Sequence, residues 1–344
     1  MQPYSLIRPI FFALDPERAH TLSLRGLALL PGLAATPPSN PLLETEVAGV
    51  RFANPVGLAA GYDKDAVAPM QLLKLGFGSV EVGTLTPLPQ AGNPRPRLFR
   101  LVEDRAVINR MGFNNGGQQD ARQRLAARRR VGVVGVNIGA NKDAADRIQD
   151  YVLGVQAMAG VADYLTVNIS SPNTPGLRAL QDKGALAELL ARVTTARGAD
   201  GPPIFLKVAP DLEPADIDDI AALVIEQGID ALIVSNTTIS RPALRSRWGA
   251  EAGGLSGAPL RDLALARLRD FRVATGGKIP LIGVGGIATA EDAYARIRAG
   301  ASLVQLYSAL VYEGPGLARR IANGLAELLQ RDGFSNVREA VGRN

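Results

Sequence analysis

The sequence predicts an α/β protein in which a (β/α)8 TIM barrel follows a small N-terminal helical extension. The first observation is a rhythm of eight short apolar runs, each followed by a helical pattern. Such runs indicate parallel strands buried on both faces of a sheet. The second is that each run ends in polar or glycine-rich sequence, as a site at the strand ends requires. The third is length, because eight units in roughly 290 residues fit a closed barrel better than an open doubly wound sheet.

The individual elements can be placed from these patterns. A short hairpin around Ala48-Gly49 is expected at 47–52, ahead of the barrel. The barrel strands are expected at 56–60, 79–82, 132–136, 164–167, 204–208, 231–234, 280–284 and 303–306. Helices are expected near 65–75, 116–130, 147–160, 184–198, 214–227, 259–275, 290–299 and 315–330. The long connection at 85–115 is expected to hold a second hairpin, with strands at 97–101 and 106–109.

Residues 1–40 are expected to form a separate N-terminal extension, and 41–344 the barrel domain. The extension should contain one helix at about 5–14 and a second that starts at Pro16, with Asp15 as its N-cap, before a proline-rich linker. Ordinary packing on the barrel and a hydrophobic collar in a membrane interface both fit its pattern. Its apolar stripe comprises Leu6, Ile7, Ile10, Phe11, Leu14, Leu22, Leu27, Leu29 and Leu30, and its basic counterpart Arg8, Arg18 and Arg25.

Composition excludes several classes of chemistry. The chain has no cysteine, which excludes disulfides, thiolate-ligated zinc, iron–sulfur clusters and a cysteine base. His20 is the only histidine, so a histidine-based metal site is not expected. The formal net charge of +5 selects no class of anionic partner. The densest basic cluster, at 122–130, is interpreted as the solvated face of a helix.

The ends of the predicted strands carry the side chains that a binding site needs. Every end offers an amide, a hydroxyl, a lysine or a glycine, and a purely structural barrel does not need that convergence. In chain order they are A-G-Y-D-K at 60–64, G-T at 83–84, N-I-G at 137–139, N-I-S-S-P-N-T-P-G-L-R at 168–178, Lys207, S-N-T-T at 235–238, G-G at 285–286 and Y-S at 307–308.

Two glycine-rich segments favour a ligand that carries a phosphate. G-V-G-G at 283–286 precedes a predicted helix, where backbone N–H groups can face an anion. Barrels of this type often bind phosphate after strands 7 and 8. G-G-L-S-G at 253–257, after the sixth strand, adds to this signal. A phosphate-bearing cofactor is therefore favoured over a structural turn.

Three side chains are candidates for chemistry. Lys207 lies inside an apolar run, and a buried ammonium needs either a salt bridge or a bound anion. Lys64 follows a tight turn, where it is either an exposed lysine or a substrate contact. Ser171 is the obvious base or nucleophile of the longest motif, and no histidine lies near it in sequence. A Ser-His-Asp hydrolase is therefore not expected.

A longer set of motifs runs in order along nearly the whole chain. They are A-A-G-Y-D-K at 59–64, E-V-G-T at 81–84, P-R-L-F-R at 96–100, N-R-M-G-F-N-N at 109–115, N-I-S-S-P-N-T-P-G-L-R at 168–178, S-N-T-T at 235–238, G-G-L-S-G at 253–257, G-V-G-G-I at 283–287 and Y-S at 307–308. This set resembles the FMN-dependent dihydroorotate dehydrogenases, and within them the quinone-reducing class 2 enzymes. Two departures are small: Tyr62 stands where the family often has Leu or Phe, and Ser235 where Thr is common.

The resemblance implies oxidation of (S)-dihydroorotate to orotate in de novo pyrimidine (UMP) biosynthesis, with FMN as prosthetic group. Lys207 would then face the N1–C2 edge of the flavin and stabilise negative charge on the reduced ring. The resemblance implies that FMN is held by Ala60, Gly61, Tyr62, Asp63, Lys64, Thr84, Asn137, Asn168, Lys207, Ser235, Gly257, Gly286, Tyr307 and Ser308.

The resemblance also assigns the substrate contacts and the base. Ser171 would take the proton from C5 of dihydroorotate while hydride leaves C6 for flavin N5. The resemblance implies that the soluble class 1 relatives have a cysteine as this base, so the absence of cysteine favours class 2. Serine is a weak base at neutral pH and needs a polar environment or a proton relay. The pyrimidine would be bound by Lys64, Asn109, Arg110, Met111, Gly112, Phe113, Asn168, Asn173, Asn236 and Thr237.

For the N-terminal extension, the class 2 resemblance implies a quinone tunnel that rests on the membrane. The implied partners are a membrane quinone and anionic lipid, without nucleic acid. The expected location is the cytoplasmic face of the cell membrane, as a peripheral protein, and the expected state is a monomer. Arg100 and His20 are expected to line the tunnel, with a packing role as the alternative for His20.

Two other functions fit part of the pattern. A dihydrouridine synthase-like flavin barrel would act on RNA. That family uses a catalytic cysteine, which this chain lacks, and no RNA-binding extension is visible. A non-catalytic, membrane-associated barrel could bind a phosphate ligand, but it would not need Ser171, Lys64 and Asn173 together.

Overall fold

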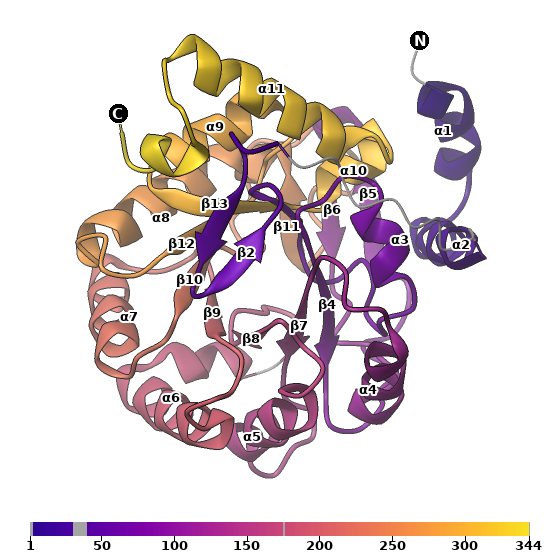
Figure 1. Ribbon diagram of the computed structural model, residues 1–344. Helices are drawn as coiled ribbons and strands as arrows, with labels where there is room; N and C mark the ends of the chain where they lie inside the picture. The colour runs from indigo at the N-terminus through magenta and orange to yellow at the C-terminus, as the bar shows by residue number, and fades with distance from the viewer. Residues whose placement is uncertain (1–2, 30–39, 175, 344) are drawn as a thin grey trace.

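Eight parallel strands close into a barrel that helices surround (Figure 1). The computed structural model describes residues 3–29, 40–174 and 176–343. Around the barrel the strands follow one another in chain order, and the last pairs with the first. The predicted (β/α)8 barrel is confirmed. Its strands are β3 (Val56–Leu58), β4 (Ser79–Leu85), β7 (Val133–Ile138), β8 (Tyr164–Asn168), β9 (Ile204–Val208), β10 (Ala231–Val234), β12 (Leu281–Val284) and β13 (Ala301–Leu306).

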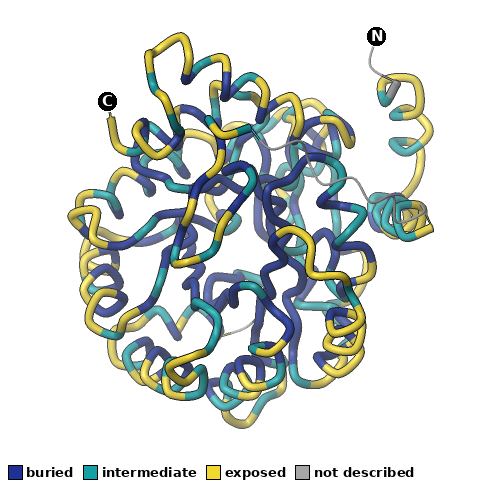
Figure 2. The backbone as a smooth tube through the Cα atoms, viewed as in Figure 1, coloured by how far each residue is buried: buried dark blue, intermediate teal, exposed yellow. Residues whose placement is uncertain are grey.

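The barrel strands are buried on both faces, as their continuous apolar runs predicted. Every residue of β4, β7, β8 and β9 is buried (Figure 2). Helices cover the outside of the barrel, and apolar side chains pack together inside it. β4 and β7 run beyond the apolar stretches that predicted them, since Leu85 still pairs with Ile138. This extension places Thr84 and Asn137 within strands rather than in the loops that follow.

The outer helices lie close to their predicted positions. α9 begins with the capping box that Thr289 and Asp292 form, in which each side chain accepts from the other's backbone N–H. The helices are α4 (Gln118–Ala127), α5 (Arg147–Met158), α6 (Lys183–Arg197), α7 (Pro214–Glu226), α8 (Arg261–Ala274), α9 (Ala290–Arg298) and α11 (Leu317–Arg331). Short 3-10 turns are η1 (Val102–Asp104), η2 (Leu177–Gln181), η3 (Ala258–Leu260) and η4 (Val337–Ala340).

Three helical predictions need correction. The helix expected at 65–75 is only five residues long, α3 (Pro69–Leu73), because Asp63 holds the preceding residues in a turn. A short helix, α10 (Ser308–Glu313), follows β13 and was not expected. Because α4 ends at Ala127, the last arginines of the basic cluster follow it. One of them, Arg128, is buried and ion-paired with Asp163, so it is not on a solvated face.

A hairpin closes the end of the barrel at which the strands begin. It consists of β1 (Thr45–Val47) and β2 (Val50–Phe52), joined by the predicted turn. Val47 and Phe52 pack with the side chains inside the barrel, which include Tyr164 and Phe205. Gly135 makes room for that layer, because a Cβ there would lie 2.0 Å from the Tyr164 ring. The predicted site residues gather at the opposite end.

A small antiparallel sheet and two helices stand at that opposite end. The predicted hairpin of β5 (Leu98–Leu101) and β6 (Ala106–Asn109) gains a third strand, β11 (Gly254–Gly257). The glycine-rich segment expected to add to a phosphate site is therefore mostly strand. Helices α1 (Pro3–Ala13) and α2 (Pro16–Leu29) lie beside this sheet (Figure 1). Leu30 and most of the proline-rich linker lie outside the described residues.

The start of α2 follows its sequence signal. The Asp15 carboxylate accepts from the backbone N–H of Glu17 at 3.1 Å and of Arg18 at 3.0 Å, so it is the predicted N-cap. In contrast, no described residue of α1 is buried (Figure 2). In the described ranges no helix is long and apolar enough to span a bilayer.

Candidate active site

A cavity of about 460 Å³ opens where the barrel strands end. The small sheet, α2 and α10 complete its walls. Parallel strands all finish at the same rim, so residues from distant parts of the chain meet there. The predicted site residues that line it are Ala60, Gly61, Tyr62, Lys64, Thr84, Asn109, Met111, Gly112, Phe113, Asn168, Ser171, Asn173, Lys207, Ser235, Asn236, Thr237, Gly257, Gly286, Tyr307 and Ser308.

Three predicted site residues lie outside this lining. Asp63 is buried, and its carboxylate accepts from the backbone N–H of Val67 and Ala68 at 2.8 Å each. Arg110 points outward to Glu251, with an N–O distance of 2.7 Å. Asn137 is fully buried one layer beneath the cavity floor. Asp63 and Arg110 have chain neighbours that line the cavity, whereas no residue of N-I-G at 137–139 does. Neighbours on the chain can thus point to different sides of the wall.

Two lysines bring positive charge into the cavity. Lys207 in β9 is buried, and burial lowers its pKa while the charge of Glu81 opposes that change. No ion pair to Lys207 occurs within the described ranges, so the salt-bridge interpretation is not supported. Lys64 lines the cavity, and desolvation lowers its pKa to about 8, against the opposing charges of Glu17 and Asp65. Both positions suit a bound anion.

Ser171 lies on the loop that follows β8 and is buried against the cavity. Its Oγ accepts from the backbone N–H of Asn173 at 3.3 Å. Asn93 also holds the loop, because its Nδ2 donates to the carbonyls of Asn173 and Arg110 at 3.1 Å each. Asn93 was not among the predicted residues, and only its distant partners reveal its place in the site.

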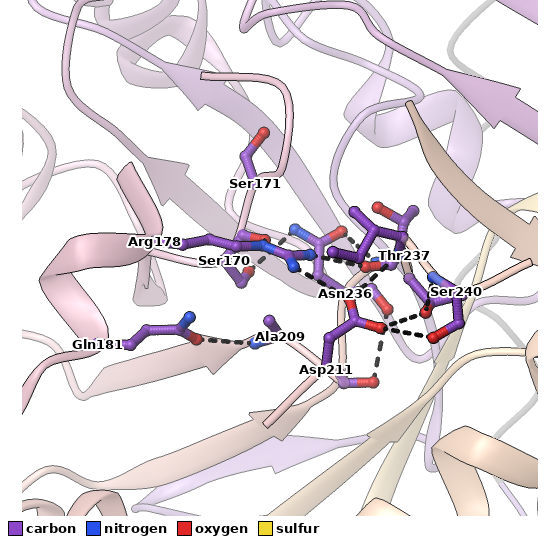
Figure 3. Close-up of polar contacts among 12 residues, drawn as sticks. Ser170, Ser171, Arg178, Gln181, Ala209, Asp211, Asn236, Thr237 and Ser240 are labelled. Atoms are coloured by element: carbon purple, nitrogen blue, oxygen red, sulfur yellow. Dashed lines mark hydrogen bonds and ion pairs between the residues drawn. The ribbon is translucent and has the colours of Figure 1, made fainter. Parts of the chain in front are cut away.

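An ion pair ties this loop to its two neighbours (Figure 3). Arg178 donates to Asp211 at 3.0 Å, to the Ser170 carbonyl at 3.2 Å and to the Thr237 carbonyl at 3.3 Å. Asp211 in turn accepts from the hydroxyls of Thr238 and Ser240 and from the N–H of Ile239. Figure 3 shows the Ser171 hydroxyl pointing away from this network. Arg178 and Asp211, here called the loop clasp, therefore hold the backbone around Ser171 without engaging its side chain.

The cavity continues toward the N-terminal helices, where its walls become aromatic. The His20 ring lies edge-on to Tyr62 at 5.1 Å between centroids, and its Nδ1 is 3.3 Å from the Tyr307 hydroxyl. Burial lowers the pKa of His20 to about 3, so the ring is neutral near pH 7. Arg100 packs over the Phe12 ring at 4.4 Å and donates to the Phe12 carbonyl. Both predicted tunnel residues, His20 and Arg100, thus line this part of the cavity.

An ion-pair cluster docks α2 on the small sheet, with Glu17 and Arg97 buried and Arg95 exposed. Glu17 accepts from Arg97 at 2.7 Å and from Arg95 at 2.9 Å. Burial alone would raise the pKa of Glu17, but the hydrogen bonds and charges of these arginines lower it to about 2. Arg97 also donates to the carbonyls of Ala91 and Asn93, so α2 is linked to the loop that holds the Ser171 segment.

Comparisons with known proteins agree with this architecture. The family model of dihydroorotate dehydrogenase matches residues 42–329. The chain belongs to the dihydroorotate dehydrogenase family. Among its relatives, a dihydroorotate dehydrogenase (quinone) of Erythrobacter litoralis is 66% identical, with 98% of this chain and 99% of the relative covered. One of Novosphingobium aromaticivorans is 63% identical, with 99% of each chain covered. The class 2, quinone-dependent type predicted from the motifs is thereby confirmed.

A solved structure of this family supports the same fold. The ligand-free DHODH of Eimeria tenella has a TM-score of 0.91 and 42% identity to this chain, and the match covers 96% of this chain and 99% of that one. A second structure, in complex with ferulenol, has the same TM-score and identity and covers 96% and 95% of the two chains.

The residues of the inner cavity fit the flavin that this family implies. Lys207 is a buried cation without a contacting carboxylate among the described residues, as a site for an electron-rich ring requires. On the side predicted to bind phosphate, Gly257 and Gly286 have φ of 96° and 72°, which only glycine adopts without strain.

Proposed function

We propose that this dihydroorotate dehydrogenase binds FMN in the inner cavity and dihydroorotate beside Ser171. The reaction is the quinone-dependent oxidation of dihydroorotate to orotate in pyrimidine biosynthesis. The observation that carries the assignment of residues is that Ser171, Lys64 and Lys207 line one cavity, although they come from three different strand ends. A phosphate-binding protein without catalysis would not need this combination.

Ser171 is proposed as the general base that removes the proton from C5 of dihydroorotate. The Asn173 N–H donates to Ser171 Oγ, and a donor at this oxygen favours its deprotonated form. Bound FMN would supply the acceptor for the hydride from C6 and pass the electrons on to the quinone. Lys207 would balance negative charge on the reduced ring with its buried ammonium.

The substrate contacts are proposed from the amides and Lys64 around Ser171. The Lys64 ammonium suits the carboxylate of dihydroorotate, because a charge-assisted hydrogen bond forms between them. Asn109, Asn173 and Asn236 line the same region and offer both donors and acceptors to ring carbonyl and N–H groups. FMN is proposed to contact Ala60, Gly61, Tyr62, Lys64, Thr84, Asn168, Lys207, Ser235, Gly257, Gly286, Tyr307 and Ser308.

The two N-terminal helices are proposed as a separate extension that admits the quinone and rests on the membrane surface. Leu6, Ile10 and Leu29 are 69%, 67% and 84% exposed. Exposure of several large apolar side chains to water is unfavourable and typical of an interaction surface. Arg18 and Arg25 are exposed on the same pair of helices and would face anionic lipid on the cytoplasmic side. Flotation with anionic vesicles tests this, with Ile10→Glu as the variant expected to stay unbound. Leu153→Glu, at a 41% exposed leucine of α5 on the barrel, is its control.

Anaerobic titration of the purified protein with dihydroorotate tests the central proposal. Flavin absorbance should bleach as the substrate is added, and the extracted flavin should be FMN. Re-oxidation by a short-chain quinone should then restore the absorbance. A bound flavin that dihydroorotate does not bleach would contradict the placement of the substrate beside Ser171.

A further inference from the structure

Glu81 is a carboxylate in the interior of the barrel whose role the proposed function leaves open. It is fully buried, and no cation forms an ion pair with it in the part of the chain that the structure describes. Its Oε1 accepts from Asn137 Nδ2 at 2.7 Å, and its Oε2 accepts from Gln305 Nε2 at 2.8 Å and from the Tyr164 hydroxyl at 3.1 Å. Burying a carboxylate without a contacting cation is costly, so a role beyond packing is expected.

A directional chain of hydrogen bonds runs from this carboxylate to the substrate side of the cavity. Asn168 Nδ2 donates to Asn137 Oδ1 at 3.2 Å, and Asn137 donates on to Glu81. The Ser170 hydroxyl donates to Asn168 Oδ1 at 2.8 Å, and Asn236 Nδ2 donates to Ser170 Oγ at 2.9 Å. Every donor in the chain thus points toward Glu81.

The direction of this chain follows from chemistry at its buried end. A carboxylate can only accept, so Asn137 must turn its NH2 group to Glu81 and its oxygen toward the cavity. That oxygen then requires donors, and it receives them from Asn168 and from the Thr84 hydroxyl at 2.6 Å. Asn168 in turn gives its NH2 group to Asn137, so its Oδ1 accepts from the Ser170 hydroxyl, and Ser170 Oγ accepts from Asn236. The orientation of these amides is therefore determined by Glu81, which has no exposed surface.

In this way the hydrogen-bonding roles of two groups on the cavity wall, Thr84 and Asn236, are fixed. Thr84 uses its only proton on Asn137, so its oxygen can face the cavity only as an acceptor. Asn236 turns its NH2 group to Ser170, while its Oδ1 accepts from the Thr237 N–H at 2.8 Å. Thr84 lies in the region proposed for FMN, and Asn236 lies in the region proposed for the pyrimidine.

We propose that Glu81 is a positioning residue that sets the donor and acceptor pattern of both pockets through Asn137. This inference rests on the proposed function for the identity of the ligands. It also accounts for Asn137, a predicted cofactor contact that lies beneath the cavity floor. As a further contribution, the charge of Glu81 opposes the lowering of the Lys207 pKa by burial.

The test compares Glu81→Met with Tyr164→Phe. Methionine has a similar length but cannot accept from Asn137, so the amide chain loses the group that orients it. Tyr164→Phe removes the hydroxyl that donates to Glu81 Oε2. It leaves Glu81 and the bond from Asn137 to Oε1 intact. Glu81→Gln keeps an acceptor without the charge and should fall between the two.

Three quantities are measured for each variant. They are the FMN dissociation constant from FMN fluorescence, the orotate dissociation constant from the flavin absorbance change, and the melting temperature of the FMN-free protein. Glu81→Met should weaken both affinities about tenfold relative to Tyr164→Phe, the size expected for an unsatisfied buried polar group. Equal affinities in the two variants, whatever their melting temperatures, would overturn the proposal.

A second variant covers the case in which Glu81→Met does not fold. Ser170→Ala breaks the chain between Asn168 and Asn236, and it should weaken orotate binding about threefold while FMN binding is unchanged. Unchanged orotate affinity in that variant would also overturn the proposal. If the unmutated protein bound FMN but not orotate, the proposed substrate would fail, and the FMN affinities would still decide the role of Glu81.

Discussion

The two ends of the cavity offer a ligand different kinds of contact. At the substrate end, asparagines, Ser171 and Lys64 surround the space, and the loop clasp and Asn93 fix the backbone behind them. At the N-terminal end, aromatic rings and apolar side chains from α1 and α2 form most of the wall, with His20 neutral and Arg100 stacked on Phe12. Directional hydrogen bonds dominate the first end and non-directional contacts the second.

The difference matches the chemistry of the two substrates. A small polar pyrimidine is distinguished by donors and acceptors in fixed positions, and this requires a rigid shell. A lipid-soluble quinone offers mostly apolar surface, so its pocket can tolerate more variation. Substitutions at the substrate end should therefore change flavin reduction strongly, and those at the N-terminal end should change quinone reduction modestly.

The largest expected effect is that of Ser171→Ala. Removal of the proposed base should lower the rate of flavin reduction by dihydroorotate about 10³-fold at neutral pH, with FMN still bound. Rapid-mixing measurements of flavin bleaching give this rate. Ser335→Ala, which removes an exposed hydroxyl bonded to Glu339 outside the cavity, should leave it unchanged. A Ser171→Ala rate within threefold of the unmutated protein would assign the proton transfer to another group.

The next effect is the pH dependence of orotate binding. Because the pKa of Lys64 is lowered to about 8, the residue is charged below that pH and neutral above it. The orotate dissociation constant should be flat from pH 6 to 7.5 and rise by up to about tenfold per pH unit above pH 8. Lys64→Arg should remove this rise, since arginine keeps its charge. An unchanged rise in Lys64→Arg would point to Lys207 instead.

A smaller effect is expected from the loop clasp. Asp211→Asn removes the charge that Arg178 meets while keeping its size, and it should lower kcat/KM for dihydroorotate about tenfold. Asp219→Asn is a matched control, because its ion pair with Lys183 is exposed and contributes little to stability. Steady-state kinetics with saturating quinone compare the two. Equal values would show that the loop keeps its position without the clasp.

The smallest effect is expected at Arg100. Arg100→Ala removes the stacking on Phe12 and should raise the quinone KM about fivefold, with the rate of flavin reduction unchanged. Arg51→Ala, at a side chain that is 90% exposed, controls for the loss of one charge. A quinone KM no higher than that of Arg51→Ala would remove Arg100 from the quinone site.

Much of the barrel and its rim could be predicted from sequence. Apolar runs of four to six residues must be buried, and their alternation with helical patterns leaves few arrangements other than a barrel. The rim residues follow directly, because strand ends are local features of the chain. This is why the amino-acid pattern alone places Lys207, inside a strand, and Ser171, after one, in the same site.

Other features were decided only by tertiary contacts. The strand formed by 254–257 pairs with β6 more than a hundred residues away, and its local sequence predicted no strand. The family resemblance also placed Asp63, Arg110 and Asn137 at the cavity, whereas each side chain turns to a partner elsewhere.

The loop clasp and the chain from Glu81 to Asn236 show the same limit. Their members are ordinary polar residues one at a time, and they acquire a role from groups on other strands. Burial and periodicity act along a short stretch of chain and can be read from it. Hydrogen-bond direction depends on which distant groups share the same enclosed space, and only the folded structure determines that.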